Sequence, residues 1–222
     1  MTKIKLFFLA GLVLMVSCIK SDKKNNNDND DSAASTTLGG DGNLSTNAVG
    51  YTYTCTSDIP GLTINQVKVL SNNNGEITLN IKAKLPASHP LTNLMPPSLV
   101  DANGNVDLIQ KYKNTSNGIL DYTNADEKPF VIIKYNGSVG DKYVRTRGNG
   151  TVSTRTITYK SSTDDYPYGF FFIKVMKVEQ NYDVHSKMPG FRKVTYIANH
   201  RWGLVGVEFE SEDGTTYNIN VY

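Results

Sequence analysis

The acidic and amide side chains of residues 101–107 are the first candidates for chemistry in this chain. They place carboxylate and amide oxygens at alternate positions, as a calcium-binding loop does. An EF-hand also requires a glycine at its sixth position and a bidentate glutamate at its twelfth, where this chain has Val106 and Tyr112. We therefore predict the turn of a hairpin here, and no metal site.

The other titratable side chains do not form a recognisable catalytic set. His89, His185 and His200 have no metal-ligand spacing between them. Asp164 and Asp165 are adjacent, and adjacent residues of a strand point to opposite faces, so we interpret this pair as a solvated turn. No serine lies in a Gly-x-Ser-x-Gly motif. The sequence therefore predicts no catalytic residue, no metal and no cofactor, and we expect the protein not to be an enzyme.

Cys18 stands at the end of an N-terminal segment typical of secreted proteins. Lys3 and Lys5 precede an apolar run at residues 6–16, and the small residue Ser17 follows it. A cationic start, an apolar stretch and a small residue before the cleavage point are the order of a secretory signal peptide. The run is shorter than the roughly 20 residues that a membrane-spanning helix needs. We therefore predict export without a spanning helix.

Residues 14–18, Leu-Met-Val-Ser-Cys, resemble the lipobox of Gram-negative bacterial lipoproteins. In that family a signal peptidase cuts before the cysteine, which then carries a diacylglycerol and an N-linked acyl chain. Met15 departs from the leucine that is usual at its position. The resemblance implies that Cys18 is lipidated and anchors the protein in the outer membrane, where three acyl chains hold it essentially permanently. Cys55 then has no disulfide partner, and we expect a small buried apolar residue there.

The composition changes abruptly after Cys18. Residues 19–47 are rich in Lys, Asn, Asp, Ser, Thr and Gly, and contain too little apolar surface to offset the entropy of ordering. We divide the chain into a signal peptide at residues 1–17, a lipidated cysteine with a disordered tether at 18–48, and a β domain at 49–222. An acid-rich run after the cysteine resembles the export signal of lipoproteins on the bacterial surface, which favours the cell surface over the periplasmic face.

Net charge excludes one class of partner. Removal of residues 1–17 removes two lysines, so the formal net charge of +2 falls to zero. Nucleic-acid binding depends on cationic side chains that release counterions from the phosphate backbone. We therefore expect no nucleic-acid partner.

Alternation of apolar and polar residues predicts an all-β domain. It is clearest over residues 76–85, and an Asn-Gly pair at 74–75 should join this strand to residues 63–70 as an antiparallel hairpin. Further strands are expected at 51–56, 98–102, 106–112, 151–161, 169–179, 192–200, 204–211 and 215–222, and the turn at 212–214, which ends in Gly214, should close the last two as a hairpin. Such a meander of about ten antiparallel strands, with little helix, can form a curled half-barrel, a barrel or a sandwich.

Aromatic side chains supply the candidate ligand contacts. The run that begins with Phe170 is apolar on both sides, which predicts a central strand covered on both faces. Trp202, the only tryptophan, can stack on a sugar ring or an apolar ligand, or plug the end of a barrel, and we prefer the plug. The candidate contacts are Trp202, Tyr166, Tyr168, Phe170 and Phe172.

Residues 138–144 and 198–207 resemble a layout found in uncharacterised bacterial lipoproteins, in which a Val-Gly-Asp-Lys-Tyr strand start leads to a Gly-Leu-Val strand. Some of these proteins have the curled sheet of the lipoprotein-carrier family, which shelters acyl chains. The resemblance covers about residues 137–222, implies a fold and carries over no catalytic residue.

Three functional hypotheses follow. The leading one is a non-catalytic envelope lipoprotein whose β domain binds a lipid in an apolar groove, a glycan, or an envelope protein. The groove version predicts an apolar concave face opposite the strand at Phe170, and the glycan version predicts exposed aromatic rings near Trp202 or Tyr166. The alternatives are a structural module of an envelope assembly and an enzyme with an unrecognised site.

Overall fold

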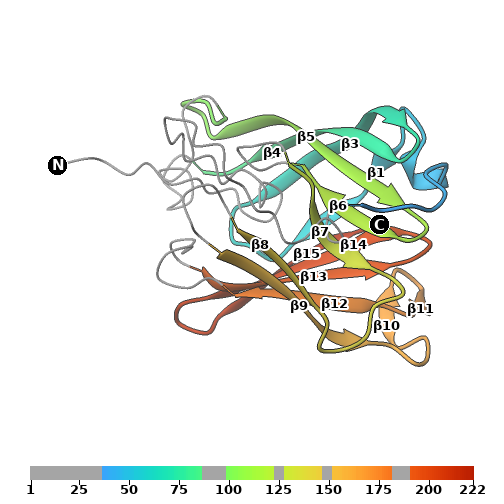
Figure 1. The fold of residues 1–222 in the computed structure, drawn as a ribbon. Coiled ribbons are helices and arrows are strands. Elements are labelled where there is room, and N and C mark those ends of the chain that lie inside the picture. The colour runs from blue at the N-terminus through green and yellow to red at the C-terminus, as the bar shows by residue number, and fades with distance from the viewer. Residues whose placement is uncertain (1–36, 87–98, 123–127, 147–151, 182–190) are drawn as a thin grey trace, which may run out of the picture.

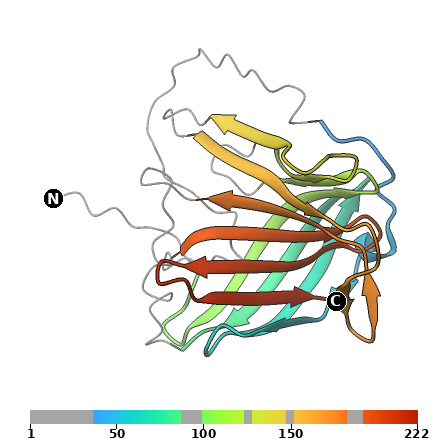
Figure 2. The ribbon, with the colours of Figure 1, turned by 90° about the horizontal axis from the view of Figure 1, so that it is seen from below.

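The computed structural model describes residues 37–86, 99–122, 128–146, 152–181 and 191–222. These residues form antiparallel strands in two sheets that lie face to face, as Figures 1 and 2 show, together with a projecting hairpin. The one helical turn among them is a 3-10 helix, η1 (Ser45–Asn47). The all-β prediction is confirmed, and the sheets remain open rather than closing into a barrel. No helix in the described ranges has the length and apolarity to cross a membrane.

The first sheet contains the N-terminal strands. Its six strands pair in the order β1-β3-β4-β5-β6-β7. Their bounds are β1 Thr52–Tyr53, β3 Thr63–Asn73, β4 Glu76–Lys84, β5 Asn105–Thr115, β6 Gly118–Asp121 and β7 Phe130–Lys134. Apart from β1, neighbours in the sheet are consecutive in the chain, so the sheet is a meander.

The second sheet contains the C-terminal strands, apart from the hairpin, and one early strand. Its seven strands pair in the order β2-β15-β14-β13-β12-β9-β8. Their bounds are β2 Cys55–Ser57, β8 Lys142–Thr146, β9 Val152–Lys160, β12 Met176–Asn181, β13 Phe191–Asn199, β14 Gly203–Ser211 and β15 Thr216–Val221. The remaining two strands, β10 (Tyr166–Tyr168) and β11 (Phe171–Ile173), pair only with each other.

The strand expected at residues 51–56 passes from one sheet to the other. Its first part is β1, which pairs with β3, and its second part is β2, which pairs with β15. Between them the Thr54 N–H donates to the Tyr222 carbonyl at 3.0 Å, and the Tyr222 N–H donates back to the Thr54 carbonyl at 2.8 Å. The chain therefore joins the two sheets along this edge.

Local turn chemistry accounts for the two hairpins that the sequence predicted most clearly. Asn74 and Gly75 adopt φ angles of 50° and 86° between β3 and β4, as the expected Asn-Gly turn requires. Gly214, at φ 87°, closes the hairpin of β14 and β15. Both hairpins are confirmed. The expected strand at residues 98–102 is reduced to an isolated bridge between Val100 and Val106.

The core lies between the sheets and receives the inward-facing residues of both. Ile77, Leu79 and Ile81 of β4 belong to this core, and Val207 and Phe209 of β14 contribute to it from the second sheet. Burial of each such side chain contributes about 1.5–3 kcal/mol. Alternation in the sequence therefore translates directly into the two faces of each sheet.

The packed part of the chain begins before residue 49, the boundary that composition indicated. Leu38 is buried in the core, and the Asn47 side chain is fully buried. Asn47 Nδ2 donates to the Gly42 and Asn114 carbonyls at 2.9 and 2.8 Å, and its Oδ1 accepts from Asn114 Nδ2 at 2.9 Å. The domain boundary was inferred from apolar composition, and a segment held by hydrogen bonds of polar side chains does not show in such a pattern.

Candidate ligand-binding site

A two-stranded hairpin projects from the sandwich near the C-terminus (Figure 2). Tyr168 of β10 pairs with Phe171 of β11, which leaves Gly169 and Phe170 as the turn. Gly169 has φ 62°, the positive angle that the first residue of a type II′ turn requires. The turn therefore presents Phe170 at the tip of the hairpin.

The side chains of this hairpin correct one prediction. The run from Phe170 was expected to be a central strand covered on both faces, and this is wrong. Phe170 is fully exposed, Phe171 and Phe172 are 50% and 61% exposed, and only Ile173 is buried. The reversal at Gly169 turns the run back on itself, and β12 starts only at Met176. The phenylalanines thus face solvent rather than a second layer.

Trp202 lies beside the hairpin in the turn between β13 and β14. The Tyr168 ring centroid is 5.8 Å from that of Trp202 and 5.3 Å from that of Tyr222. Asn199 fixes the turn, because its Oδ1 accepts the N–H groups of Arg201 and Trp202 at 2.7 and 3.1 Å. Trp202 is half-buried and packs on the hairpin, so the expected role as a barrel plug is wrong.

The five predicted contact residues therefore come together at one place. Tyr168 packs with Ile173, Val175, Ile197 and Val205 in a small apolar cluster separate from the main core, with Tyr166, Trp202 and Tyr222 against it. This cluster holds one side of the hairpin through Tyr168 and Ile173, while the three phenylalanines stay exposed. We call the exposed part the aromatic site, and it consists of Phe170, Phe171, Phe172 and Trp202.

A hollow opens at the base of the aromatic site. It encloses about 420 Å³ and is lined by Asp164, Phe171, Phe172, Ile173, Lys174, Asn199, His200, Arg201 and Trp202. A second hollow of about 160 Å³ shares Lys174, Asn199 and His200 with it. The larger volume falls in the range of about 300–1,000 Å³ that small-molecule sites occupy. The lining therefore combines aromatic side chains with polar ones, and two of the polar ones, Lys174 and Arg201, are cations.

The cations of the hollow are not neutralised by neighbouring acids. Among the described residues, neither Lys174 nor Arg201 forms an ion pair, and the Arg201 guanidinium lies 5.4 Å from the Trp202 ring centre in a cation–π contact. Asp164 is the one carboxylate in the lining. With Lys174 and Arg201 against Asp164, the hollow therefore carries a net positive charge.

The phenols of the site are hydrogen-bonding groups rather than acids or bases. Burial raises the pKa of Tyr168 to about 12, and burial also raises the pKa of Tyr166. Both side chains therefore stay neutral at physiological pH and keep their O–H groups.

A cavity of about 90 Å³ lies between the sheets and is lined mainly by apolar residues of both. Cys55, Tyr112 and Asn114 also line it. Burial raises the pKa of the Cys55 thiol from 9.0 to about 12, so the thiol stays protonated at neutral pH. Cys55 is half-buried, rather than fully buried as expected. The cavity is well below the volume range of ligand pockets, which argues against an acyl chain between the sheets.

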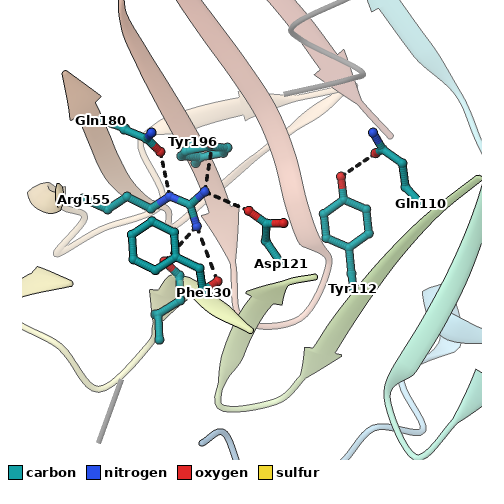
Figure 3. A network of polar contacts seen from close by, with 8 residues as sticks. Gln110, Tyr112, Asp121, Phe130, Arg155, Gln180 and Tyr196 are labelled. Atoms are coloured by element: carbon teal, nitrogen blue, oxygen red, sulfur yellow. Dashed lines mark hydrogen bonds and ion pairs between the residues drawn. The ribbon is translucent and has the colours of Figure 1, made fainter. Parts of the chain in front are cut away.

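Arg155 of β9 is a buried cation, 3% exposed, and is shown in Figure 3. Its Nη2 donates to Asp121 Oδ2 at 2.8 Å, and its Nε donates to Gln180 Oε1 at 2.8 Å. Its Nη1 donates to the carbonyls of Phe130 and Val131 at 3.4 and 3.0 Å. The guanidinium also lies 4.0 Å from the Phe130 ring centre. Arg155 thus ties the second sheet to β6 and β7 of the first.

Sequence reasoning missed this network, although the pattern of β9 contained a signal. Ser153, Arg155 and Ile157 lie on the buried face of the strand, at alternate positions. Because Arg155 is two residues from the inward-facing Ile157, the alternation placed a charged side chain on the core face, where an apolar residue is usual. The partner Asp121, however, belongs to the other sheet, so no local pattern identifies the pair.

The remaining candidates for chemistry are turns. Asp101 Oδ1 accepts the N–H groups of Asn103 and Asn105 at 2.8 and 2.9 Å, which confirms a hairpin turn. Asp165 is exposed and accepts from Tyr159 and Ser161, as expected of a solvated turn. In the described ranges, no three His, Cys, Asp or Glu residues cluster to hold a metal ion.

Three of the predicted positions lie outside the described residues, namely Cys18, His89 and His185. No protein-family model matches this chain, and no curated protein or solved structure matches it either. The side chains themselves must therefore carry the functional argument.

Proposed function

We propose that this chain is a non-catalytic envelope lipoprotein, anchored by lipid at Cys18, whose β-sandwich binds a ligand or partner at the aromatic site. The anchor is supported by the lipobox-like sequence at residues 14–18, and the acid-rich run after Cys18 favours the cell surface of the outer membrane. The binding role rests on one observation, the three consecutive exposed phenylalanines of the hairpin.

Exposed phenylalanines at a hairpin tip contribute little to folding. Burying a phenylalanine side chain is worth about 1.5–3 kcal/mol, and Phe170 gains none of it within the chain. Single exposed apolar residues are ordinary, but a contiguous apolar patch beside a hollow is characteristic of an interaction surface. A partner that covers the aromatic site recovers this free energy on binding.

The buried ion pair supports a structural rather than a catalytic role for the interior. Arg155 and Asp121 are 3% and 4% exposed in their side chains, and Arg155 hydrogen-bonds to Asp121, Gln180, Tyr196 and two carbonyl groups of β7. A group enclosed in this way cannot meet a substrate without separation of the sheets. The aromatic site, in contrast, is open to solvent.

Metabolic labelling tests the anchor. Cells supplied with an alkyne-bearing fatty acid should incorporate it into the wild-type chain and not into Cys18→Ala, which should leave the membrane fraction. Equal labelling of the wild-type and Cys18→Ala chains would contradict the proposal that Cys18 carries the lipid anchor.

Site-specific photo-crosslinking tests the binding site. A photoreactive phenylalanine analogue at position 170 should give a discrete adduct on intact cells, whereas the same analogue at Ile109, 60% exposed on β5, should give none. Mass spectrometry of the adduct then separates a lipid, a glycan and a protein. The absence of any adduct specific to position 170 would overturn the proposed binding site.

A further inference from the structure

One side of the hairpin is packed and the other is apolar and exposed. Phe170 lies at the tip, and Phe171 and Phe172 follow it with 50% and 61% exposure, whereas Tyr168, the partner of Phe171, is buried beside Trp202. Strands rise about 3.3 Å per residue, so the tip lies on the order of 10 Å beyond Ile173. Apolar faces of interfacial membrane proteins enter the bilayer surface to about 5–10 Å.

The cations of the hollow stand at the base of the same hairpin. Lys174 directly follows β11, and Arg201 precedes Trp202 in the neighbouring turn. With the exposed phenylalanines inside the acyl region, the half-buried Trp202 ring beside the hairpin fits the headgroup level, and lysine and arginine fit the phosphates. Asp164 opposes them with one negative charge, so the base remains net cationic.

A glycan fits this arrangement less well than a bilayer does. Sugar sites present aromatic faces together with hydrogen-bonding groups, whereas phenylalanine has no polar tip. Asn199, the amide in the hollow, already uses its Oδ1 on two backbone N–H groups and its Nδ2 on the Lys174 carbonyl at 2.7 Å.

We propose that hairpin β10–β11 inserts its phenylalanine tip into the surface of a phospholipid bilayer that contains anionic lipid, with Lys174 and Arg201 at the phosphates. The inference rests on the proposed function, because it assigns a partner class to the same aromatic site. It adds a second membrane contact, made by protein side chains, to the proposed lipid anchor.

Trp202 provides the test, because it is the only tryptophan of the chain. The full chain, purified as it occurs in the envelope, is placed in vesicles of phosphatidylcholine with phosphatidylglycerol. Brominated lipids are present either in the same vesicles or only in added vesicles that carry no protein. Insertion should shift the Trp202 emission to the blue and quench it in at least one arrangement.

Variants identify the side chains responsible. The double substitution Phe170→Ser with Phe172→Ser should abolish most of the quenching, and the matched control Ile109→Ser should preserve it. Lys174→Gln should weaken the interaction about fivefold with anionic vesicles, because each cation near such a surface contributes about 1 kcal/mol. Far-ultraviolet circular dichroism should be the same for all variants, since each replaced side chain is exposed.

Three results would overturn the inference. These are an unquenched Trp202 in both vesicle arrangements, quenching that survives the double substitution, and a saturable Trp202 response to a soluble oligosaccharide without quenching by vesicles. An adduct to a glycan or a protein at position 170, combined with an unquenched Trp202, would refute insertion into a bilayer but support the proposed binding function. The absence of both the adduct and the quenching would refute the insertion and the proposed binding function together.

Discussion

Arg155 shows what a single charged residue does inside this sandwich. A buried charge is tolerated only when it is paired and hydrogen-bonded. Arg155 meets this condition through Asp121, Gln180, Tyr196 and two carbonyl groups of β7. The contacts come from both sheets, so the residue fixes the position of one sheet relative to the other.

Removal of the guanidinium should therefore be costly. Arg155→Met takes away the cation that faces Asp121, and we expect a loss of about 3–5 kcal/mol in the free energy of unfolding. Arg155→Met combined with Asp121→Leu should cost less than the sum of the two single substitutions, because no lone charge is then buried. Urea unfolding measures each value.

The exposed pair Lys82–Asp107 is the control for this prediction. Its side chains are 48% and 62% exposed, with 3.5 Å between nitrogen and oxygen, so Lys82→Ala should cost less than about 1 kcal/mol. Strict additivity of the Arg155 and Asp121 substitutions would contradict the account of the buried pair.

Buried thiol and phenol groups set the alkaline limit of stability. Burial raises the pKa of Cys55 to about 12 and raises the pKa values of Tyr53, Tyr112, Tyr135 and Tyr196. In the unfolded chain these groups lose protons near their ordinary values of 9 and 10. Their contribution to stability is therefore complete below pH 9 and declines as the pH rises above it.

Urea unfolding at several pH values measures this effect. Each group that is ionised only in the unfolded chain lowers the free energy of unfolding by about 1.4 kcal/mol per pH unit. Cys55→Ala should remove the decline that starts near pH 9 and leave the later one due to the tyrosines. A free energy of unfolding that stays constant up to pH 10.5 would show that these groups titrate normally in the folded chain.

At the level of elements, the strand boundaries that could be predicted are those set by local turn residues. The hairpins at Gly75 and Gly214 follow from residue types that favour positive φ angles, so they were visible in the sequence. The reversal at Gly169 has the same local cause, but the apolar run around it matched a buried strand better. The passage of residues 52–57 between sheets depends on partners far away in the chain, and no local pattern contains it.

Alanine substitutions at two glycines can distinguish the stability cost of backbone strain from the cost of a steric clash. Gly75 and Gly214 have φ angles of 86° and 87°. A Cβ at Gly75 would lie 2.7 Å from the Asn114 carbonyl oxygen, whereas at Gly214 it would meet nothing within 4 Å. Gly214→Ala should therefore cost only the strain, about 1–2 kcal/mol, and Gly75→Ala should cost clearly more.

Thermal and urea unfolding of the two alanine variants provide the comparison. Equal losses would mean that the contact of β3 and β4 with β5 has room for a methyl group, which would contradict the packing described at Gly75.

The candidate site, too, was predictable from local sequence only in part, because some of its contacts join residues far apart in the chain. The five contact residues were chosen for their aromatic character, and the structure gathers them at one end of the sandwich. Lys174 and Arg201 were not predicted, because their proximity depends on Asn199 linking the β13–β14 turn to the chain after β11. The sequence therefore identified the aromatic residues of the site, whereas its cationic residues became visible only from the tertiary contacts.

At the scale of the whole molecule, the core and the site occupy separate regions. The main core and the Arg155 network hold the two sheets together, while the hairpin has a small apolar cluster of its own. Changes at the phenylalanine tip should therefore leave the fold intact and alter only binding. This separation is what makes the site testable on living cells.

The most direct test asks whether the hairpin tip is covered in the cell. Phe170→Cys and Val139→Cys each place a thiol at an exposed position, and the native Cys55 gives little background because its pKa is raised to about 12. Labelling of intact cells with N-ethylmaleimide is compared with labelling after denaturation in urea. The account predicts that Phe170→Cys reacts about tenfold more slowly than Val139→Cys on cells, after each rate is normalised to its denatured value. Equal normalised rates would show a tip that faces open solvent, and would contradict the central claim.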